Sequence, residues 1–519
     1  MRNLKKIIIS LLIVLMVGLL LSVNVFSNEK VAGSTQEYII IQSHDVHGMF
    51  LPKKEKGGME AWATEITRLR KEYPNRVIVL DSGDINTGTL ISDVPYKGIF
   101  GGAMIEFMNE LGYDVWTPGN HEFDKGQKNC LGYAKLADFP TVCANIVYTA
   151  TGEPFFPPYT IIDVDGLKIG VIGVMEEIFK MEIVKKHTEG LDVLSIASVV
   201  ATYAMFLEPR TDLIFVLVQG GMDDTRLAAQ PPVDLILPSA TPEGGAVAGA
   251  AGNVTKINEI YVAGGPSGKD GGIGKIIIEV RDNEIISVNE EDLWLPAEEA
   301  KPPLMIKAMV EKYQGMIDKE FGEVIGQLKT AWVRAEPESN IGDWQADVMR
   351  AKTGTDFAFQ NSGGIRKDLP AGPITKRDIM EISPFHNTLA TFTVSGAELK
   401  HILEWNFERG WDLLQMSGIT CSVDMNQKYG ERVSDICVNE EPLKLDKVYT
   451  GTFNDYGIGH DKDKYFDLEA HNKVDTHIPL AQSEIEAVID QKVIDIKMQN
   501  RIKVKPAAES YLLENVCLS

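Results

Sequence analysis

Short apolar runs alternate with longer amphipathic stretches over about the first 300 residues of the chain. The runs are rich in β-branched residues and have the length of buried strands, whereas residues 59–72 place apolar side chains at helical spacing. This alternation predicts an α/β domain. Its expected strands are residues 38–41, 77–80, 167–174, 213–218, 233–236 and 275–280.

The pattern changes near residues 296–303, where proline is frequent. A charged segment with helical periodicity follows at residues 304–321, and we expect it to connect two domains. A second α/β region begins near Gly322. The predicted limits are therefore 36–300 for the first domain, 301–321 for the connecting helix and 322–519 for the second domain.

The N-terminal residues have the layout of a secretory signal peptide. Basic residues precede an apolar run at 7–23, and small residues surround Ser27. We expect residues 1–27 to be a signal peptide that is cleaved near Ser27, which makes the protein secreted, cell-surface or periplasmic. An uncleaved membrane anchor is the alternative, because the run approaches the ~20 residues that span a bilayer.

The chain is strongly acidic, with 74 acidic and 51 basic residues and a formal net charge of −23. Such a charge repels polyphosphate backbones and anionic membrane surfaces. We therefore expect no nucleic-acid polymer as a partner and no stable membrane insertion after signal cleavage. A small phosphate ester is compatible if its site is locally cationic, since the field of distant charges is screened beyond ~8 to 10 Å.

Five cysteines are too few for a disulfide scaffold in a chain of 519 residues. Cys130 can pair with Cys143 and Cys421 with Cys437, which leaves Cys517 unpaired. Buried free thiols fit the spacing equally well. The cysteine pattern therefore leaves both alternatives open.

Three motifs with metal-binding side chains follow expected strands: D-V-H-G at 45–48, D-S-G-D at 81–84 and G-N-H-E-F-D at 119–124. Carboxylate, amide and imidazole groups suit zinc, manganese or similar divalent ions, and a shared aspartate can bridge two ions ~3.5 to 4 Å apart. Each motif alone is weak evidence, because an Asp-Gly turn is usually only a turn. Together they predict a metal site for phosphate chemistry.

In order and spacing, these motifs resemble the 5'-nucleotidase family of calcineurin-like metallophosphoesterases. The resemblance implies a four-layer αββα sandwich followed by a second α/β nucleotide-recognition domain. It also implies one or two divalent ions, with Asp45 and His47 on one ion, Asp84 as the bridge and Asn120 on the other ion. The catalytic pair that it implies is His121 and Asp124.

The second half of the first domain departs from the family pattern. The resemblance calls for histidines at positions that align with Gln219, Ser239 and Thr241, and the chain has no histidine between His187 and His386. Loss of such ligands puts the second ion in doubt. Removal of even a residue that only hydrogen-bonds to a metal ligand lowers metal affinity or activity ~10- to 100-fold. The candidates to compensate for the lost ligands are His44, Asp223, Asp224 and Glu243.

A second fingerprint runs through the C-terminal region, in the motifs at 339–343, 361–366, 384–385, 414–418 and 454–456. It resembles the nucleotide-recognition domain of the same family. The resemblance implies that Phe385 and Tyr456 sandwich a base while Asn361 and Arg366 hold polar groups, with Arg334 as a weaker candidate. The turn at 458–463 departs from the family pattern.

These patterns predict a secreted, metal-dependent phosphoesterase that hydrolyses nucleotides or related phosphate esters. The first alternative is a homologue that binds nucleotides or nucleosides without hydrolysis, since ligand histidines are replaced. The second is an enzyme for another phosphorylated or cyclic nucleotide. The identities of the metal and the substrate stay open at this point.

Overall fold

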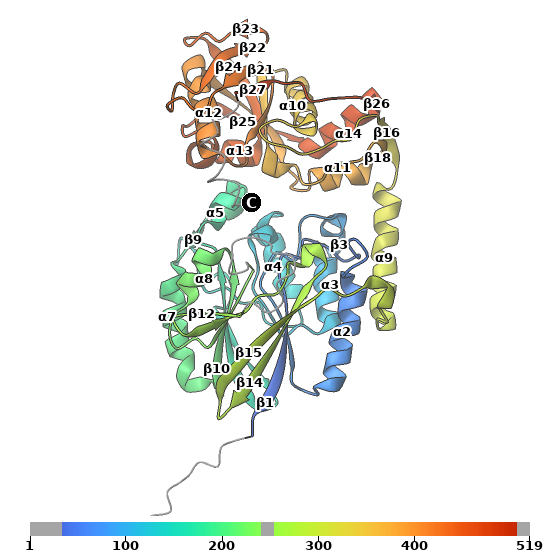
Figure 1. Ribbon diagram of the computed structural model, residues 1–519, viewed down its shortest axis with the longest axis vertical. Helices are drawn as coiled ribbons and strands as arrows, with labels where there is room; N and C mark the ends of the chain where they lie inside the picture. Colours follow the sequence, from blue (N-terminus) through green and yellow to red (C-terminus); the bar gives the residue numbers. More distant parts are fainter. Residues whose placement is uncertain (1–33, 240–253, 506–519) are drawn as a thin grey trace, which may run out of the picture.

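The computed structural model describes residues 34–239 and 254–505 of the chain (Figure 1). The predicted signal peptide, Thr241, Glu243 and Cys517 lie outside this part. Within it, no helix combines the length and the apolar character needed to cross a bilayer. Cys130, Cys143, Cys421 and Cys437 are free thiols.

The N-terminal half contains two main sheets. The first has the strand order β15 (Glu284–Leu293), β14 (Ile273–Arg281), β1 (Gln36–Ser43), β2 (Val77–Asp81) and β5 (Val115–Trp116). The second has the order β12 (Thr255–Ile257), β13 (Ile260–Val262), β11 (Leu235–Pro238), β10 (Leu213–Gln219), β8 (Leu167–Met175) and β7 (Tyr159–Val164). Because β1, β2 and β5 are parallel neighbours, their carboxyl ends meet at one edge.

The two sheets pack face to face through buried side chains such as Ile40, Ile78, Phe215 and Leu217. Helices α2 (Gly58–Glu72), α3 (Gly102–Leu111) and α9 (Leu304–Phe321) share a core with the outer face of the first sheet. Helices α7 (Ile196–Leu207) and α8 (Met222–Ala228) lie against the second sheet. This confirms the predicted four-layer αββα sandwich.

Shorter elements complete the N-terminal half. They are α4 (Gln127–Leu136), α5 (Phe179–Glu182), α6 (Lys185–Thr188) and the two-stranded ribbons β3 (Pro95–Tyr96) with β4 (Ile99–Phe100) and β6 (Ile146–Tyr148) with β9 (Leu191–Val193). One expected strand is displaced, since β11 begins at Leu235 instead of Val233. The Asp234 carboxylate accepts a hydrogen bond from Ile214 N at 2.7 Å, which anchors the start of the strand.

The C-terminal half is a second α/β unit above the first in Figure 1, joined to it through α9. Its largest sheet has the order β20 (Leu414–Ser417), β17 (Phe357–Asn361), β24 (Val448–Asn454), β19 (Thr388–Ser395) and β25 (His471–Pro479). Two smaller sheets contain β18 (Gly372–Thr375), β16 (Val324–Leu328) and β26 (Val493–Ile494), and β23 (Glu441–Pro442), β22 (Val433–Val438), β21 (Ile419–Val423) and β27 (Ile502–Val504). Its helices are α10 (Asn340–Thr353), α11 (Lys376–Ile382), α12 (Gly396–Arg409), α13 (Asp455–Gly459) and α14 (Leu480–Gln491).

This half has hydrophobic cores of its own. Phe359, Phe392 and Phe453 belong to strands of the large sheet and are buried together with Phe466. Trp332 and Trp344 lie in a separate cluster that includes residues of α14. The side chains of these two cores all come from the C-terminal half. The predicted second α/β unit is confirmed.

The loop that carries α5 and α6 reaches from the N-terminal half to the C-terminal half. Tyr456 Oη donates a hydrogen bond to Met181 O at 3.0 Å, and His460 Nε2 lies 2.9 Å from Ile183 O. Lys186 Nζ forms an ion pair with Asp455 at 2.9 Å. These contacts, together with α9 on another side, hold the two halves facing each other.

Candidate functional site

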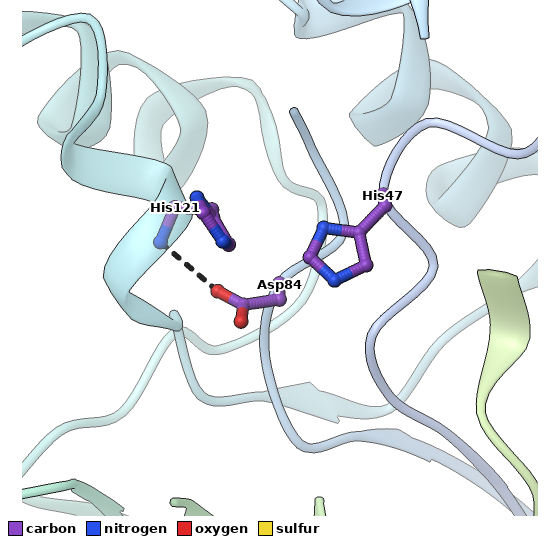
Figure 2. Close-up of side chains that lie close together, drawn as sticks. All are labelled: His47, Asp84 and His121. Atoms are coloured by element: carbon purple, nitrogen blue, oxygen red, sulfur yellow. Dashed lines mark hydrogen bonds between the residues drawn. The ribbon is translucent and has the colours of Figure 1, made fainter. Parts of the chain in front are cut away.

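Three loops at the carboxyl ends of β1, β2 and β5 carry the side chains predicted to bind metal. The ligand atoms of His47, Asp84 and His121 all lie within 4.8 Å of one another. Figure 2 shows the three side chains converging, with the His121 amide donating to Asp84 Oδ1 at 3.0 Å. The parallel sheet thus brings together residues from loops far apart in the sequence.

The backbone of these loops is held in an uncommon conformation. Asp45, His47 and Asp84 have φ values of 46°, 50° and 59°, in the left-handed region that side chains other than glycine rarely adopt. Asp45 N donates to Gly83 O and His47 N donates to Asp84 O, both at 2.9 Å. These bonds fix the first two loops against each other.

Glu122 ties the second loop to the third. Its buried carboxylate accepts hydrogen bonds from the backbone N–H groups of Asp84 at 3.0 Å, Asn86 at 3.1 Å and Gly119 at 2.6 Å. The side chain therefore positions Asp84 and Asn120 without pointing at the cluster itself.

His47 is suited to metal binding because its ring is neutral. Its Nδ1 lies 2.9 Å from Thr87 O, so that nitrogen carries the proton and Nε2 keeps a free lone pair. Burial, reinforced by the charge of His121, lowers the pKa of His47 to about 3. The ring therefore stays unprotonated at neutral pH.

His121 has the opposite protonation state. Its Nδ1 lies 2.8 Å from Asp124 Oδ2. Burial lowers the pKa of His121, but the negative charges of Asp124 and Asp84 and the hydrogen bond to Asp124 outweigh burial and raise it to about 9. An imidazolium at this position can stabilise negative charge on a phosphoryl group.

His44 supports Asp45 from behind the site. It is buried, with Nε2 2.8 Å from Gly265 O and Nδ1 3.1 Å from Asp45 Oδ2. Burial raises the pKa of Asp45, but the hydrogen bond and charge of His44 overcome this and hold the pKa below its ordinary value. Since both His44 nitrogens are engaged, His44 orients Asp45 and does not reach the cluster as a ligand.

The residues predicted to bind a nucleoside also come together. Asn361, Arg366, Phe385 and Tyr456 line a cavity of about 270 Å³ that His121 and Asp124 also line. We name it the nucleoside cavity. Arg334 does not line this cavity; it lies 3.2 Å from Asp368 and donates to Ile365 O at 3.3 Å, next to Arg366.

Comparisons with known proteins match this arrangement. A family model described as "5'-nucleotidase, C-terminal domain" matches residues 324–469. Protein UshA of Yersinia enterocolitica is 26% identical over 499 residues, covering 82% of this chain and 86% of that protein. The crystal structure of a 5'-nucleotidase precursor from Thermus thermophilus has a TM-score of 0.75 at 25% identity and covers 91% of this chain and all of that one.

The chain is thus similar to 5'-nucleotidases along most of its length, and its residues 324–469 match the C-terminal domain of that family. Another relative, Endonuclease YhcR of Bacillus subtilis, is 27% identical over 475 residues, which cover 81% of this chain. The matched region spans only 37% of the length of YhcR.

The chain departs from the pattern that the resemblance implies at Gln219, which ends β10. Its Nε2 donates a hydrogen bond to Asp84 Oδ2 at 3.1 Å and lies 3.0 Å from the side-chain amide of Asn120. The amide therefore sits between the two side chains that would share the second ion. Gly83 makes room for it, since a Cβ there would lie 2.6 Å from Gln219 Cγ.

The other replaced positions do not supply a ligand among the described residues. Ser239 Oγ accepts from Gly220 N at 3.0 Å and is turned to the backbone, while Thr241 lies outside the described residues. Asp223 is exposed and pairs with Arg226, and Asp224 accepts from Gly221 N at the start of α8. Glu243 also lies outside the described residues.

Sequence reasoning missed Glu176, which directly follows β8 at the same edge of the sandwich. Burial, then the charges of Asp84, Glu182 and Asp224, raise its pKa to about 8. The charge of Asp84 acts on it, so it stands near the cluster. The rule that polar residues after parallel strands gather at one edge could have found it. Trp411 and Asp412 were missed in the nucleoside cavity.

Proposed function

We propose that the protein is an exported, metal-dependent phosphoesterase that hydrolyses nucleotides or related phosphate esters. The observation that carries the proposal is that His121 belongs at once to the cluster with His47 and Asp84 and to the lining of the nucleoside cavity. A nucleotide with its base in that cavity places its phosphate at the cluster. The similarity of the chain to 5'-nucleotidases supports the same assignment.

The donor set fits one divalent ion better than two. His47 and Asp84 offer a neutral imidazole and a carboxylate that lie within 4.8 Å of each other, and Asp45 is on the same loop as His47 with its carboxylate bonded to His44. These are ligand types of zinc or manganese. Gln219 fills the space between Asp84 and Asn120, and its Nε2 donates a hydrogen bond to Asp84 Oδ2 at the place where the resemblance expects a second ion. A bound ion supplies a Lewis acid for the phosphate oxygens.

The remaining chemistry comes from side chains of the chain itself. His121, held as an imidazolium by Asp124, neutralises charge that develops on the phosphoryl group and can give a proton to the leaving oxygen. Arg366 lines the cavity beside Phe385 and supplies a fixed positive charge for the phosphate. The exported location rests on the predicted signal peptide at 1–27.

The test is phosphate release from AMP by the purified protein with added manganese or zinc, together with its metal content. We expect turnover that His121→Ala abolishes and that His477→Ala leaves intact, since His477 is exposed. Metal content near one ion per chain is expected. Binding of adenosine without turnover above the His121→Ala level would instead identify a nucleoside-binding homologue.

A further inference from the structure

Helix α14 carries a carboxyl group in the interior of the C-terminal half. Glu484 is 0% exposed, and its helix packs against α10, α11, β16, β25 and β26. Among the described residues, no hydrogen bond reaches either of its carboxyl oxygens. Ionisation of such a group is strongly unfavourable, because a buried charge needs donors or an opposite charge. The proposed hydrolysis makes no use of this carboxyl group.

The polar neighbours of Glu484 are Gln345 on α10 and Ser383, which follows α11. Gln345 Nε2 donates to Ser383 Oγ at 2.8 Å, whereas Gln345 Oε1 is buried without a donor from the described part of the chain. A protonated Glu484 has an O–H group that can donate to Gln345 Oε1, but an ionised one offers only acceptors. The arrangement therefore favours the protonated form. In agreement, burial raises the pKa of Glu484 to about 8 and outweighs the lowering effects of Ser383 and Gln345.

The charged groups on the elements around α14 are bonded elsewhere. Strands β16 and β26 carry none. On α10, Lys352 pairs with Glu486, Arg350 donates to Ser417, and Asp343 and Asp347 pair with Arg501. The pairs on α11 and β25 are Lys376–Glu323, Arg377–Asp318, Asp378–Lys367, Glu381–Lys367, His471–Glu398, Lys473–Asp461 and Asp475–His477. An ionised Glu484 therefore gains no counter-charge from them.

Glu484 lies behind the segment 383–387, which we name the recognition segment because Phe385 and Asn387 line the nucleoside cavity. Ser383 is the first residue of this segment and is held by Gln345. At the other end, Asn387 O accepts from Leu480 N, in the first turn of α14, at 2.8 Å. Helix α14 thus supports both ends of the recognition segment, with Phe385 between them.

We propose that Glu484 is a positioning residue whose bound proton keeps the recognition segment in the conformation that binds the nucleoside. Loss of this proton leaves a buried negative charge against Gln345 Oε1, so the contact between Gln345 and Ser383 rearranges and Phe385 loses its place against the base. Nucleoside binding then depends on pH through a group that touches neither the substrate nor the metal cluster. The inference rests on the proposed function for the identity of the ligand.

The first test is the pH dependence of adenosine binding, measured by calorimetry on the full chain at pH 7 and pH 9.5. We expect the dissociation constant of the unaltered chain to rise at least about fivefold between these values, the lower limit for loss of one stacking contact. Glu484→Gln has a neutral amide that can donate to Gln345 Oε1, so its constant should change by less than about twofold. Glu486→Gln is the matched control, since Glu486 lies on the same helix and pairs with Lys352 at the surface, and it should behave as the unaltered chain.

The second test needs no ligand. The chain is labelled with para-fluorophenylalanine, and the fluorine signal of Phe385 is assigned by its absence in Phe385→Leu. We expect this signal to shift with a midpoint near pH 8 in the unaltered chain and to lack this step in Glu484→Gln. His121, whose pKa is about 9, stacks on Phe385 in both proteins, so the difference between them isolates Glu484.

Parallel pH profiles of adenosine binding in the unaltered chain and Glu484→Gln overturn the proposal, as does a fluorine signal without the step near pH 8. If Glu484→Gln has a lowered melting temperature, Gln345→Met replaces it. That variant removes a group that lowers the pKa of Glu484, so the midpoint should move to higher pH, and an unmoved midpoint overturns the proposal. Failure of adenosine to bind at either pH would count against the proposed function, and the fluorine titration would still decide the role of Glu484.

Discussion

The imidazole ring of His121 stacks on the phenyl ring of Phe385, with centroids 5.9 Å apart and planes inclined by 22°. His121 comes from the loop after β5 and Phe385 from the C-terminal half. A single aromatic contact thus joins the candidate catalytic residue to the candidate base-stacking residue. Changes at either residue are expected to affect both binding and turnover.

Phe385→Ala should weaken adenosine binding. Base–aromatic stacking contributes ~1–3 kcal/mol, so the dissociation constant should rise by about 5- to 150-fold. Isothermal titration calorimetry measures it directly. Phe206→Ala removes an aromatic ring that is 43% exposed on α7, and it should leave the constant unchanged. Unaltered adenosine affinity in Phe385→Ala would remove Phe385 from the binding site.

Asp124→Asn should lower the pKa of His121 from about 9 towards its ordinary value of 6.5, because it removes a hydrogen-bonded negative charge. NMR titration of the histidine ring in the metal-free protein measures this change. Because the pKa of His121 is raised in the folded state, its contribution to stability is full below pH 6.5 and disappears as the pH rises through about 9.

The destabilisation caused by Asp124→Asn should therefore be larger at pH 6 than at pH 10, as judged by urea unfolding. Asp223→Asn is the matched control, since that carboxylate is exposed. Equal destabilisation at both pH values would show that the Asp124 charge does not act through His121.

Gln219→His should raise the metal content from about one ion per chain to about two, because an imidazole replaces the amide between Asp84 and Asn120. Mass spectrometry of metals in the purified protein measures the ratio. Gln219→Leu removes the amide without adding a ligand and should stay near one ion. Two ions in the unaltered chain would show that the Gln219 side chain moves aside.

Glu122→Gln should destabilise the fold, because the new amide presents N–H groups to backbone N–H donors that the carboxylate now satisfies. The amide oxygen can still accept from Asp84 and Gly119, which leaves the Asn86 N–H without an acceptor. A buried unsatisfied donor costs ~1–3 kcal/mol, so the unfolding free energy should fall by about 1 to 3 kcal/mol. Chemical denaturation measures the loss. Glu208→Gln, at an exposed position, should change stability by no more than ~0.5 kcal/mol.

Much of the fold could be predicted from the sequence because its strands are continuous apolar runs. The segment at 213–218 is buried along its whole length in β10, as a strand covered on both faces must be. The start of β11 could not be predicted, because Val233 is apolar and buried without being part of the strand. Its position depends on the Asp234–Ile214 hydrogen bond, which joins distant segments.

The candidate site was predictable only where motifs follow strands in a known order. His47, Asp84 and His121 were found this way, and the structure places them together. The position of Lys269 beside Arg366 and Arg377 was not predictable, because Lys269 comes from the N-terminal half and no local pattern links it to the two arginines of the C-terminal half. Likewise, only the folded chain shows that Gln219 points between Asp84 and Asn120.

The separate hydrophobic cores of the two halves have an evolutionary consequence. Loss of an imidazole at the end of β10 alters one edge of the sandwich and leaves the packing around Phe359 and Phe453 untouched. Selection can therefore change the edge of the sandwich without disturbing the packing of the C-terminal core. A descendant can abandon catalysis and persist as a ligand sensor, or exchange its specificity and keep its catalyst, without either half having to refold.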